Sequence, residues 1–341
     1  MQTSAKHFEF RGEAGEFFKI WIVNIVLSIV TLGIYSAWAK VRTKRYFYSN
    51  TLLMNTPFDY LADPLKILKG RLLAFGLILL YSLSALLSPV LQGAVLIIIL
   101  FALPWIIIKA LKFNLYNSAY RNIRFSFDAD YLRALGVFIG FPILVPLTLG
   151  LAYPAFVRAR KKFVIDHSAY GTSTFTMEAT NGQFYGVYLK AAGIMLLAVL
   201  AAVALARLNQ SLSLASEGSA VFALLFFMLL IWLPLFITIY GYLYTSISNL
   251  VINHTGLQQC RFESALTTAA ICRLYIVNTL AIMLSLGLLI PWAMIRTARY
   301  RLSCLTMVSS GDMNAFIAAE AEKAEALGEE LDDLLDLDIG L

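Results

Sequence analysis

The chain has 341 residues and a formal net charge of +6, and 60% of its residues are hydrophobic while 14% are charged. Soluble domains contain about 25% charged residues, so this composition excludes an ordinary water-soluble enzyme and a disordered protein, and it indicates a membrane protein. The three cysteines and three histidines show no metal-ligand or disulfide spacing, so we predict no metal site and no cofactor.

Seven apolar segments follow one another along the chain. They cover residues 17–39, 72–88, 93–111, 134–156, 189–208, 220–245 and 273–295. Four are uninterrupted and long enough to cross a bilayer. They predict two membrane-spanning helical hairpins, the first turning between Ser88 and Gly93. The other three are interrupted by a glycine, which favours a tight turn. These hinge glycines are Gly33, Gly150 and Gly287.

The glycine-interrupted segments leave two topologies open. Either all seven segments cross the membrane, or these three turn back as broken helical hairpins. In the second topology, 25 of the 26 basic residues before the tail lie on one side, and Arg207 alone lies on the other. Lys and Arg concentrate in cytoplasmic loops. We therefore expect four crossings, re-entrant broken hairpins and cytoplasmic termini, with seven crossings as the alternative.

Two repeated patterns predict the architecture. Eleven identities relate residues 22–46 to residues 276–300 at a constant shift of 254, and a weaker copy lies at a shift of 117. Alternating aromatic and polar residues after short polar turns predict β-hairpins, which we expect to pair in a small sheet because lone hairpins are marginally stable. The predicted fold is an all-α polytopic membrane protein with pseudo-repeated Gly/Pro-broken helical hairpins and short cytoplasmic β-hairpins.

The charges divide the chain into two regions. Residues 312–341 hold ten acidic residues and one base, whereas residues 1–311 hold 26 basic and 11 acidic residues. We predict a membrane domain over residues 1–311 and an acidic cytoplasmic tail over residues 312–341, in which Ala315–Leu337 is either a docking helix or a solvated tail. The basic clusters adjoin apolar segments, which favours anionic lipids of the phospholipid bilayer over nucleic acid as partner. A homo-oligomer or a membrane partner stays open.

Two asparagines, Asn24 and Asn278, occupy equivalent positions of the repeat inside apolar segments. Polar residues within a membrane indicate function. Together with backbone exposed at the hinge glycines, the two carboxamides could line a permeation site, as broken helices do in transporters. The alternative is a helix–helix hydrogen bond worth about 0.6–2 kcal/mol.

Basic and aromatic residues mark the expected membrane interface. The candidates for binding lipid headgroups are Arg42, Arg45, Arg158, Arg160, Lys161, Lys162, Arg296 and Arg299. The alternative is that these cations determine topology without a ligand preference. The aromatic residues that fit interfacial anchoring are Trp38, Tyr46, Trp292 and Tyr300.

Several phrases of the sequence resemble the YjgN family of bacterial inner-membrane proteins, a family of unknown function. They are Phe8–Phe10 with Gly12, Asn24, Thr31–Tyr35, Trp38-Ala39 with Arg42, Arg45 and Tyr46, Asn50-Thr51, Phe58–Tyr60, Leu68–Arg71, and Tyr120–Asn122 with Phe125. The likeness is dense over residues 8–175 and looser from there to residue 305. It implies a multi-pass protein of the inner membrane, and it assigns no catalytic or transport residue.

Two function hypotheses remain, and neither is catalytic because the sequence contains no catalytic motif. The first is a permease or channel-like protein for a small solute or lipid, with its path near Asn24 and Asn278. The second is a non-transporting membrane scaffold that binds anionic lipids or partner proteins through a basic cytoplasmic face.

Overall fold

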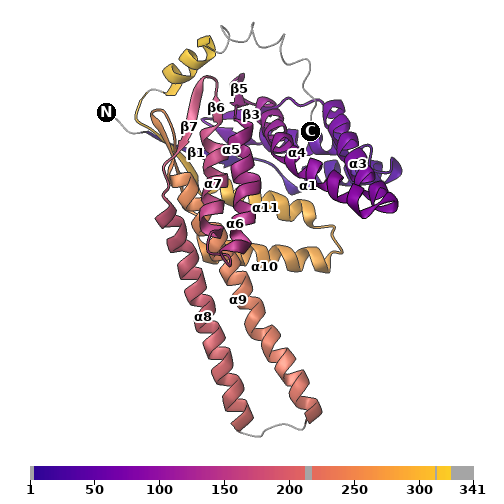
Figure 1. Cartoon of the computed structure of the whole chain (residues 1–341). Coiled ribbons are helices and arrows are strands. Elements are labelled where there is room, and N and C mark those ends of the chain that lie inside the picture. Colours follow the sequence, from indigo (N-terminus) through magenta and orange to yellow (C-terminus); the bar gives the residue numbers. More distant parts are fainter. Residues whose placement is uncertain (1–3, 212–216, 312, 324–341) are drawn as a thin grey trace.

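The computed structural model describes residues 4–211, 217–311 and 313–323. In this part of the chain, ten short strands form a closed barrel from which helical hairpins project (Figure 1). The strands are β1 (Ser4–Phe10), β2 (Thr51–Leu53), β3 (Thr56–Tyr60), β4 (Ser118–Tyr120), β5 (Ile123–Phe127), β6 (Ser168–Tyr170), β7 (Ser173–Met177), β8 (Thr255–Leu257), β9 (Cys260–Ser264) and β10 (Leu305–Ser309). All neighbours are antiparallel, and β1 pairs with both β10 and β2, which closes the barrel.

The prediction of an all-α membrane fold with short cytoplasmic β-hairpins is therefore wrong. Strands β2 to β9 form the hairpins that the sequence predicts, but these join one another and both terminal strands in one barrel. Closure pairs the edge strands that separate hairpins would leave exposed. The sequence did not predict the closed barrel because short strands give little alternation of polar and apolar residues. Four of the strands, β2, β4, β6 and β8, have only three residues each.

Five phenylalanines form one layer of the barrel interior. They are Phe8, Phe58, Phe125, Phe175 and Phe262, on β1, β3, β5, β7 and β9. Their cross-strand partners are Leu53, Tyr120, Tyr170, Leu257 and Met307. All these side chains belong to one hydrophobic cluster. This layer is therefore the core that holds the strands together.

A short helix over residues 313–323 covers the end of the barrel where the hairpins turn (Figure 1). Its Met313 and Ile317 are buried in the cluster of the barrel interior. Arg121, in the turn between β4 and β5, donates a hydrogen bond to Asn314 Oδ1 at 2.9 Å. This part of the predicted acidic tail is thus a docked helix, and residues 312 and 324–341 lie outside the described residues.

Helical hairpins connect the strand pairs. The long hairpins consist of α3 (Pro64–Leu87) with α4 (Pro89–Tyr116), and of α8 (Asn181–Ser211) with α9 (Glu217–Asn253). The short hairpins consist of α1 (Ala14–Val30) with α2 (Ser36–Ser49), of α5 (Tyr131–Leu135), the π-helical η1 (Gly136–Gly140) and α6 (Phe141–Leu147) with α7 (Tyr153–Asp166), and of α10 (Thr268–Leu284) with α11 (Ile290–Ser303).

The four long helices carry the segments that are long and apolar enough to cross a membrane. Within the described residues these segments are Pro64–Leu87, Pro89–Tyr116, Asn181–Ala204 and Pro234–Asn253. The predicted turn from Ser88 to Gly93 is too long, because α4 already begins at Pro89. Ser88 caps this helix, and its hydroxyl accepts a hydrogen bond from the Val90 N–H at 3.2 Å.

Each glycine-interrupted segment reverses direction at a left-handed Leu–Gly pair. Leu32, Leu149 and Leu286 have φ of 49–50°, and the glycines that follow them have φ of 87–93°. These leucines form the tips of the short hairpins and are 94–95% exposed. The segments are therefore helix–turn–helix units and not kinked single helices.

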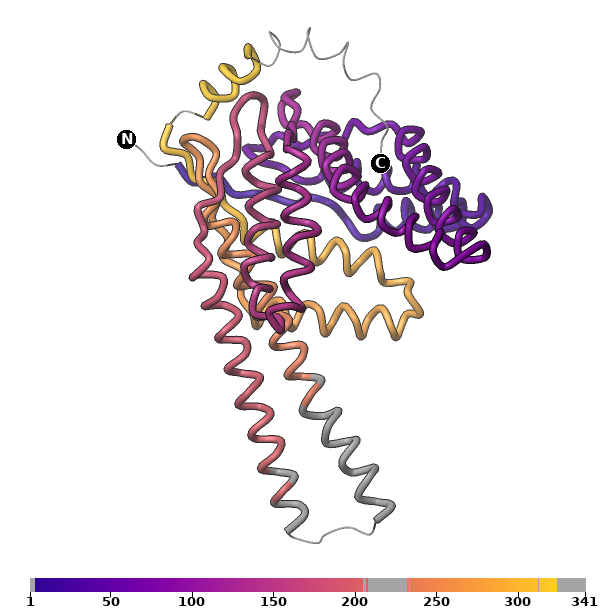
Figure 2. The backbone as a smooth tube through the Cα atoms, in the orientation of Figure 1, coloured from indigo at the N-terminus to yellow at the C-terminus, as the bar shows by residue number. Residues whose placement is uncertain are grey.

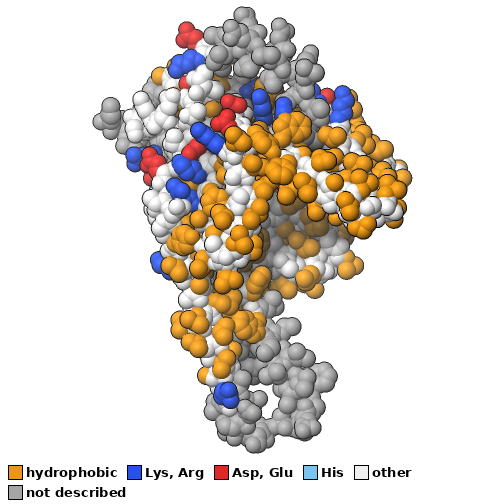
Figure 3. Space-filling model, in the orientation of Figure 1, with side chains coloured by type: hydrophobic (Ala, Val, Ile, Leu, Met, Phe, Trp, Pro, Cys, Tyr) orange, Lys and Arg blue, Asp and Glu red, His pale blue; other side chains and the backbone are white. Residues whose placement is uncertain are grey.

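The charged and apolar surfaces are separated along the molecule. On the face in Figure 3, apolar side chains cover the projecting helices, and most charged side chains gather around the barrel. Figure 2 shows α8 and α9 extending side by side away from the barrel. This separation is the one expected of a polar domain at the surface of a membrane.

Candidate functional site

Asn24 and Asn278 each link the two helices of a short hairpin. The Asn24 side-chain amide donates to the Ala39 carbonyl at 3.4 Å, and the Asn278 amide donates to the Ala293 carbonyl at 3.3 Å. Both asparagines are 5% exposed. The two asparagines thus form the helix–helix hydrogen bond that was the alternative to a permeation site.

Most of the basic residues singled out in the sequence contact the protein itself. Arg42 and Arg296 donate to the carboxamide oxygens of Asn24 and Asn278 at 3.5 and 3.3 Å. Four others donate to backbone carbonyls at or just beyond strand ends: Arg45 to Tyr60 and Ala62, Arg158 to Ala179, Lys162 to Met177, and Arg299 to Gly12. These bonds satisfy carbonyls that the strands leave unpaired, so the cations fasten the helices to the barrel.

The remaining predicted cations and the aromatic residues also contact other parts of the protein, and Arg160 and Lys161 are exposed to solvent. Arg160 lies 5.8 Å from the centre of the Phe156 ring, and Lys161 lines a cavity near the barrel. The four aromatic residues have these partners: Trp38 stacks on Tyr35, Arg296 lies over Trp292, the Tyr46 hydroxyl donates to the Glu13 carbonyl, and the Tyr300 hydroxyl accepts from the Thr267 N–H.

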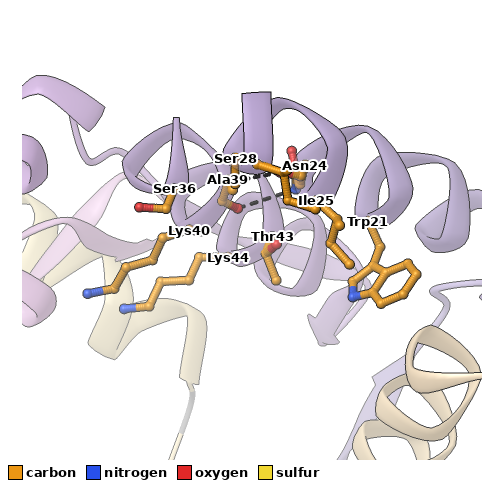
Figure 4. A pocket seen from close by; sticks show the side chains of 10 residues that line it. Trp21, Asn24, Ile25, Ser28, Ser36, Ala39, Lys40, Thr43 and Lys44 are labelled. Atoms are coloured by element: carbon orange, nitrogen blue, oxygen red, sulfur yellow. Dashed lines mark hydrogen bonds between the residues drawn. The ribbon is translucent and has the colours of Figure 1, made fainter. Parts of the chain in front are cut away.

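A cleft of about 560 Å³ opens between α1 and α2 (Figure 4). Trp21, Ile25 and Ile29 give it an apolar wall. Its polar wall consists of Asn24, Ser28, Ser36, Thr43, Lys40 and Lys44. The cleft therefore presents apolar surface and ammonium groups side by side.

Three cations gather at the polar end of the cleft. Lys40 and Lys44 lie one turn apart on α2, and their side chains extend in the same direction (Figure 4). Arg71 of α3 donates to the Ser36 hydroxyl, and Lys44 Nζ donates to Asn114 Oδ1 at 2.6 Å. Across residues 4–211, 217–311 and 313–323, no carboxylate forms an ion pair with any of the three. Within these ranges the cluster thus carries positive charge without a paired carboxylate.

Burial and like charges act on these ammonium groups together. Burial lowers the pKa of Lys44 to about 8, with a smaller contribution from Lys40. The pKa of Lys40 is lowered by burial and then by Arg71. An anion placed here would favour the charged forms. No group of three or more His, Cys, Asp or Glu side chains that could hold a metal ion occurs among the described residues.

Lys40, Lys44 and Arg71 were not among the site residues predicted from the sequence. The i, i+4 spacing of Lys40 and Lys44 could have placed both on one helix face. Arg71 carries no such signal, because only the packing of α3 on α2 brings it to the cleft.

Comparisons with known proteins agree with the resemblance found in the sequence. A protein named inner membrane protein YjgN from Salmonella typhimurium is 32% identical over 142 residues, which is 41% of this chain and 36% of that protein. The protein of the same name from Escherichia coli O157:H7 is 30% identical over 159 residues, which is 45% of this chain and 39% of that protein. The matched part thus spans less than two-fifths of the length of these relatives.

No solved structure matches the chain. The apolar helices and these relatives show that it is a membrane protein. A family described as "Bacterial protein of unknown function (DUF898)" matches residues 5–334, nearly the whole sequence. The chain belongs to this DUF898 family of bacterial proteins.

Proposed function

We propose that this protein binds an anionic phospholipid in the cleft between α1 and α2 and belongs to the bacterial inner membrane. The observation that carries the proposal is the cluster of Lys40, Lys44 and Arg71, which adjoins an apolar wall and has no carboxylate partner in the described ranges. A phospholipid offers the complementary pair of groups. Its phosphate suits the cations, and its acyl chains suit Ile25 and Ile29.

The closed barrel constrains how the chain meets the bilayer. Every helical hairpin begins and ends at a strand of the same barrel. The number of membrane crossings between consecutive strand pairs must therefore be even. This supports two crossings for each long hairpin, none for the short ones, and thus four crossings in place of seven. The cations around the barrel favour a cytoplasmic location for it.

The tips of the short hairpins support their insertion into the membrane. Burying one exposed leucine such as Leu32 or Leu286 among acyl chains is worth about 1.5–3 kcal/mol. A bilayer also requires backbone groups to be satisfied within the protein. The hydroxyls of the turns meet this need: Thr31, Thr148 and Ser285 accept from the N–H groups of Tyr35, Ala152 and Leu289 at 2.9–3.0 Å.

The permeation hypothesis receives less support than lipid binding. Asn24 and Asn278 direct their carboxamides to the facing helix and to an arginine of their own hairpin. They are therefore engaged in holding hairpins together. Their corresponding contacts support the predicted internal repeat, and lipid binding agrees with the scaffold hypothesis.

The test is the retention of lipid by charge variants of the cleft. We expect Lys40→Gln with Lys44→Gln to reduce phosphatidylglycerol bound to the purified protein at least ten-fold, since each basic residue contributes about 1 kcal/mol. Native mass spectrometry in mixed phosphatidylglycerol and phosphatidylcholine measures both lipids at once.

The matched control is Lys6→Gln with Arg261→Gln, which removes the same charge from strands of the barrel. This control should retain phosphatidylglycerol as the unaltered protein does. The same phosphatidylglycerol occupancy in both double variants, or no preference for it over phosphatidylcholine in the unaltered protein, would contradict the proposal.

A further inference from the structure

A second cavity, of about 340 Å³, lies where α7, α9 and α11 meet the barrel. Val251, Leu302 and Leu305 form part of its apolar wall. Leu302 and Leu305 also pack against the hydrophobic cluster of the barrel interior. The cavity therefore adjoins the barrel core, and none of its lining residues belongs to the cleft between α1 and α2.

The polar groups of this cavity come from four elements. Lys161 lies on α7, Arg301 on α11, Ser248 on α9 and Ser264 on β9. The Ser264 hydroxyl donates to Asn249 Oδ1 at 2.7 Å. No acidic residue occurs among the described residues that line the cavity. Two solvent-exposed cations thus line the same cavity, and the Ser248 and Ser264 hydroxyls are the other polar side-chain groups among its described lining residues.

Among the residues that the structure describes, no carboxylate forms an ion pair with Lys161. Burial lowers its pKa, and Arg160 and Arg301 lower it further. A guanidinium and an ammonium from two different helices that line one cavity suit a phosphate group. The guanidinium donates in a planar fork and the ammonium acts as a point charge. An anion between them would offset both the burial and the mutual repulsion of the cations.

We propose that this cavity binds a small phosphate-bearing anion, held between Lys161 and Arg301 with the Ser248 hydroxyl as a further donor. Its volume is in the range of small-molecule sites, about 300–1,000 Å³. Inorganic phosphate and a small phosphomonoester both carry the phosphate group that these cations would bind. The site differs from the proposed lipid cleft in its helices and its lining residues.

Isothermal titration of the purified full chain with inorganic phosphate, in phosphatidylcholine nanodiscs, tests the site. We expect saturable binding in the unaltered protein and at least ten-fold weaker binding in Lys161→Gln and in Arg301→Gln. Arg160→Gln is the matched control, since it removes the neighbouring charge on the same helix without altering the lining. Absence of saturable binding, or equal affinity in all four proteins, would overturn the proposal.

A further measurement identifies the source of the phosphate. Displacement of inorganic phosphate by phosphatidylglycerol in the nanodiscs would assign the site to a lipid headgroup, and an unchanged titration would assign it to a soluble anion.

A milder variant distinguishes loss of the site from misfolding. Ser248→Ala removes one hydroxyl and should weaken binding while keeping the thermal unfolding midpoint. Lys40→Gln with Lys44→Gln should keep phosphate binding here, so that this proposal and the proposed lipid site fail separately.

Discussion

The carboxylate of Glu320 joins segments that lie 148 residues apart in the sequence. It is 1% exposed and accepts hydrogen bonds from the Thr172 N–H at 2.7 Å and from the Ser173 hydroxyl at 2.8 Å. Burial by itself raises the pKa of Glu320, but these hydrogen bonds outweigh it and the pKa is lower than usual. A carboxyl group of this kind stabilises the folded state at pH values above its unfolded pKa, about 4.3. That stabilisation is lost as the pH falls through the folded pKa.

We predict that Glu320→Gln weakens docking of helix 313–323 by about 1.5–3 kcal/mol, the usual value for hydrogen bonds to a charged group. Amide hydrogen exchange of residues 313–323 at pH 7 should become faster. Acidification below about pH 4 should speed exchange in the unaltered protein and have less effect in the variant. Glu322→Gln, at an exposed position of the same helix, is the control. Exchange that is equally slow in both variants would refute this role.

At the scale of elements, the short hairpins depend on two residues at their turns. A leucine with φ near 50° costs about 1–2 kcal/mol, and the glycine after it has a φ that side chains disfavour. Gly33 and Gly76 provide a matched pair, because a Cβ added at either would meet no atom within 4 Å. They differ in backbone conformation, since φ at Gly33 is +92° while Gly76 lies within α3.

We predict that Gly33→Ala lowers stability by about 1 kcal/mol or more, because alanine is strained at positive φ. Gly76→Ala should leave stability unchanged or raise it by up to about 1 kcal/mol, since alanine favours a helix interior. Thermal unfolding of the purified protein compares the two variants. A midpoint that falls equally in both would show that the turn conformation does not limit the stability of the hairpin.

At the scale of the whole molecule, the barrel fixes the relation between distant segments. β1 pairs with β10 in the register Ser4 to Ser309, and the helical hairpins leave and re-enter the barrel between successive strand pairs. Strands that share one barrel must share one side of a membrane. The charge asymmetry of the sequence independently favours the proposed topology of four crossings.

Cysteine accessibility gives the corresponding prediction. In a cysteine-free background, Asp166→Cys and Thr180→Cys should both react with an impermeant maleimide from the cytoplasmic side alone. Arg207→Cys, near the far end of α8, should react from the periplasmic side and serves as the control. Reaction of Asp166→Cys or Thr180→Cys from the periplasm would support seven crossings. It would also contradict a barrel whose strands all lie on one side of the membrane.

Local patterns in the sequence determined the apolar helices, the Leu–Gly turns and the strand hairpins. Each of these features is set by neighbouring residues in the sequence. Examples are the long apolar run of α3, the turn at Gly33 and the alternating side chains of β5. The resemblance to the YjgN family also needed only such phrases, and the comparisons confirm it.

Only the tertiary structure decided the closed barrel and the grouping of cations. The pairing of β1 with β10 joins the two ends of the described chain, and three-residue strands carry almost no periodicity. Arg71 reaches Lys40 through the packing of α3 on α2, and Arg301 reaches Lys161 through the packing of helices around the barrel. These contacts depend on how whole helices and strands pack against one another. The stabilising energy comes from many contacts across the core, so no single segment of the sequence determines them.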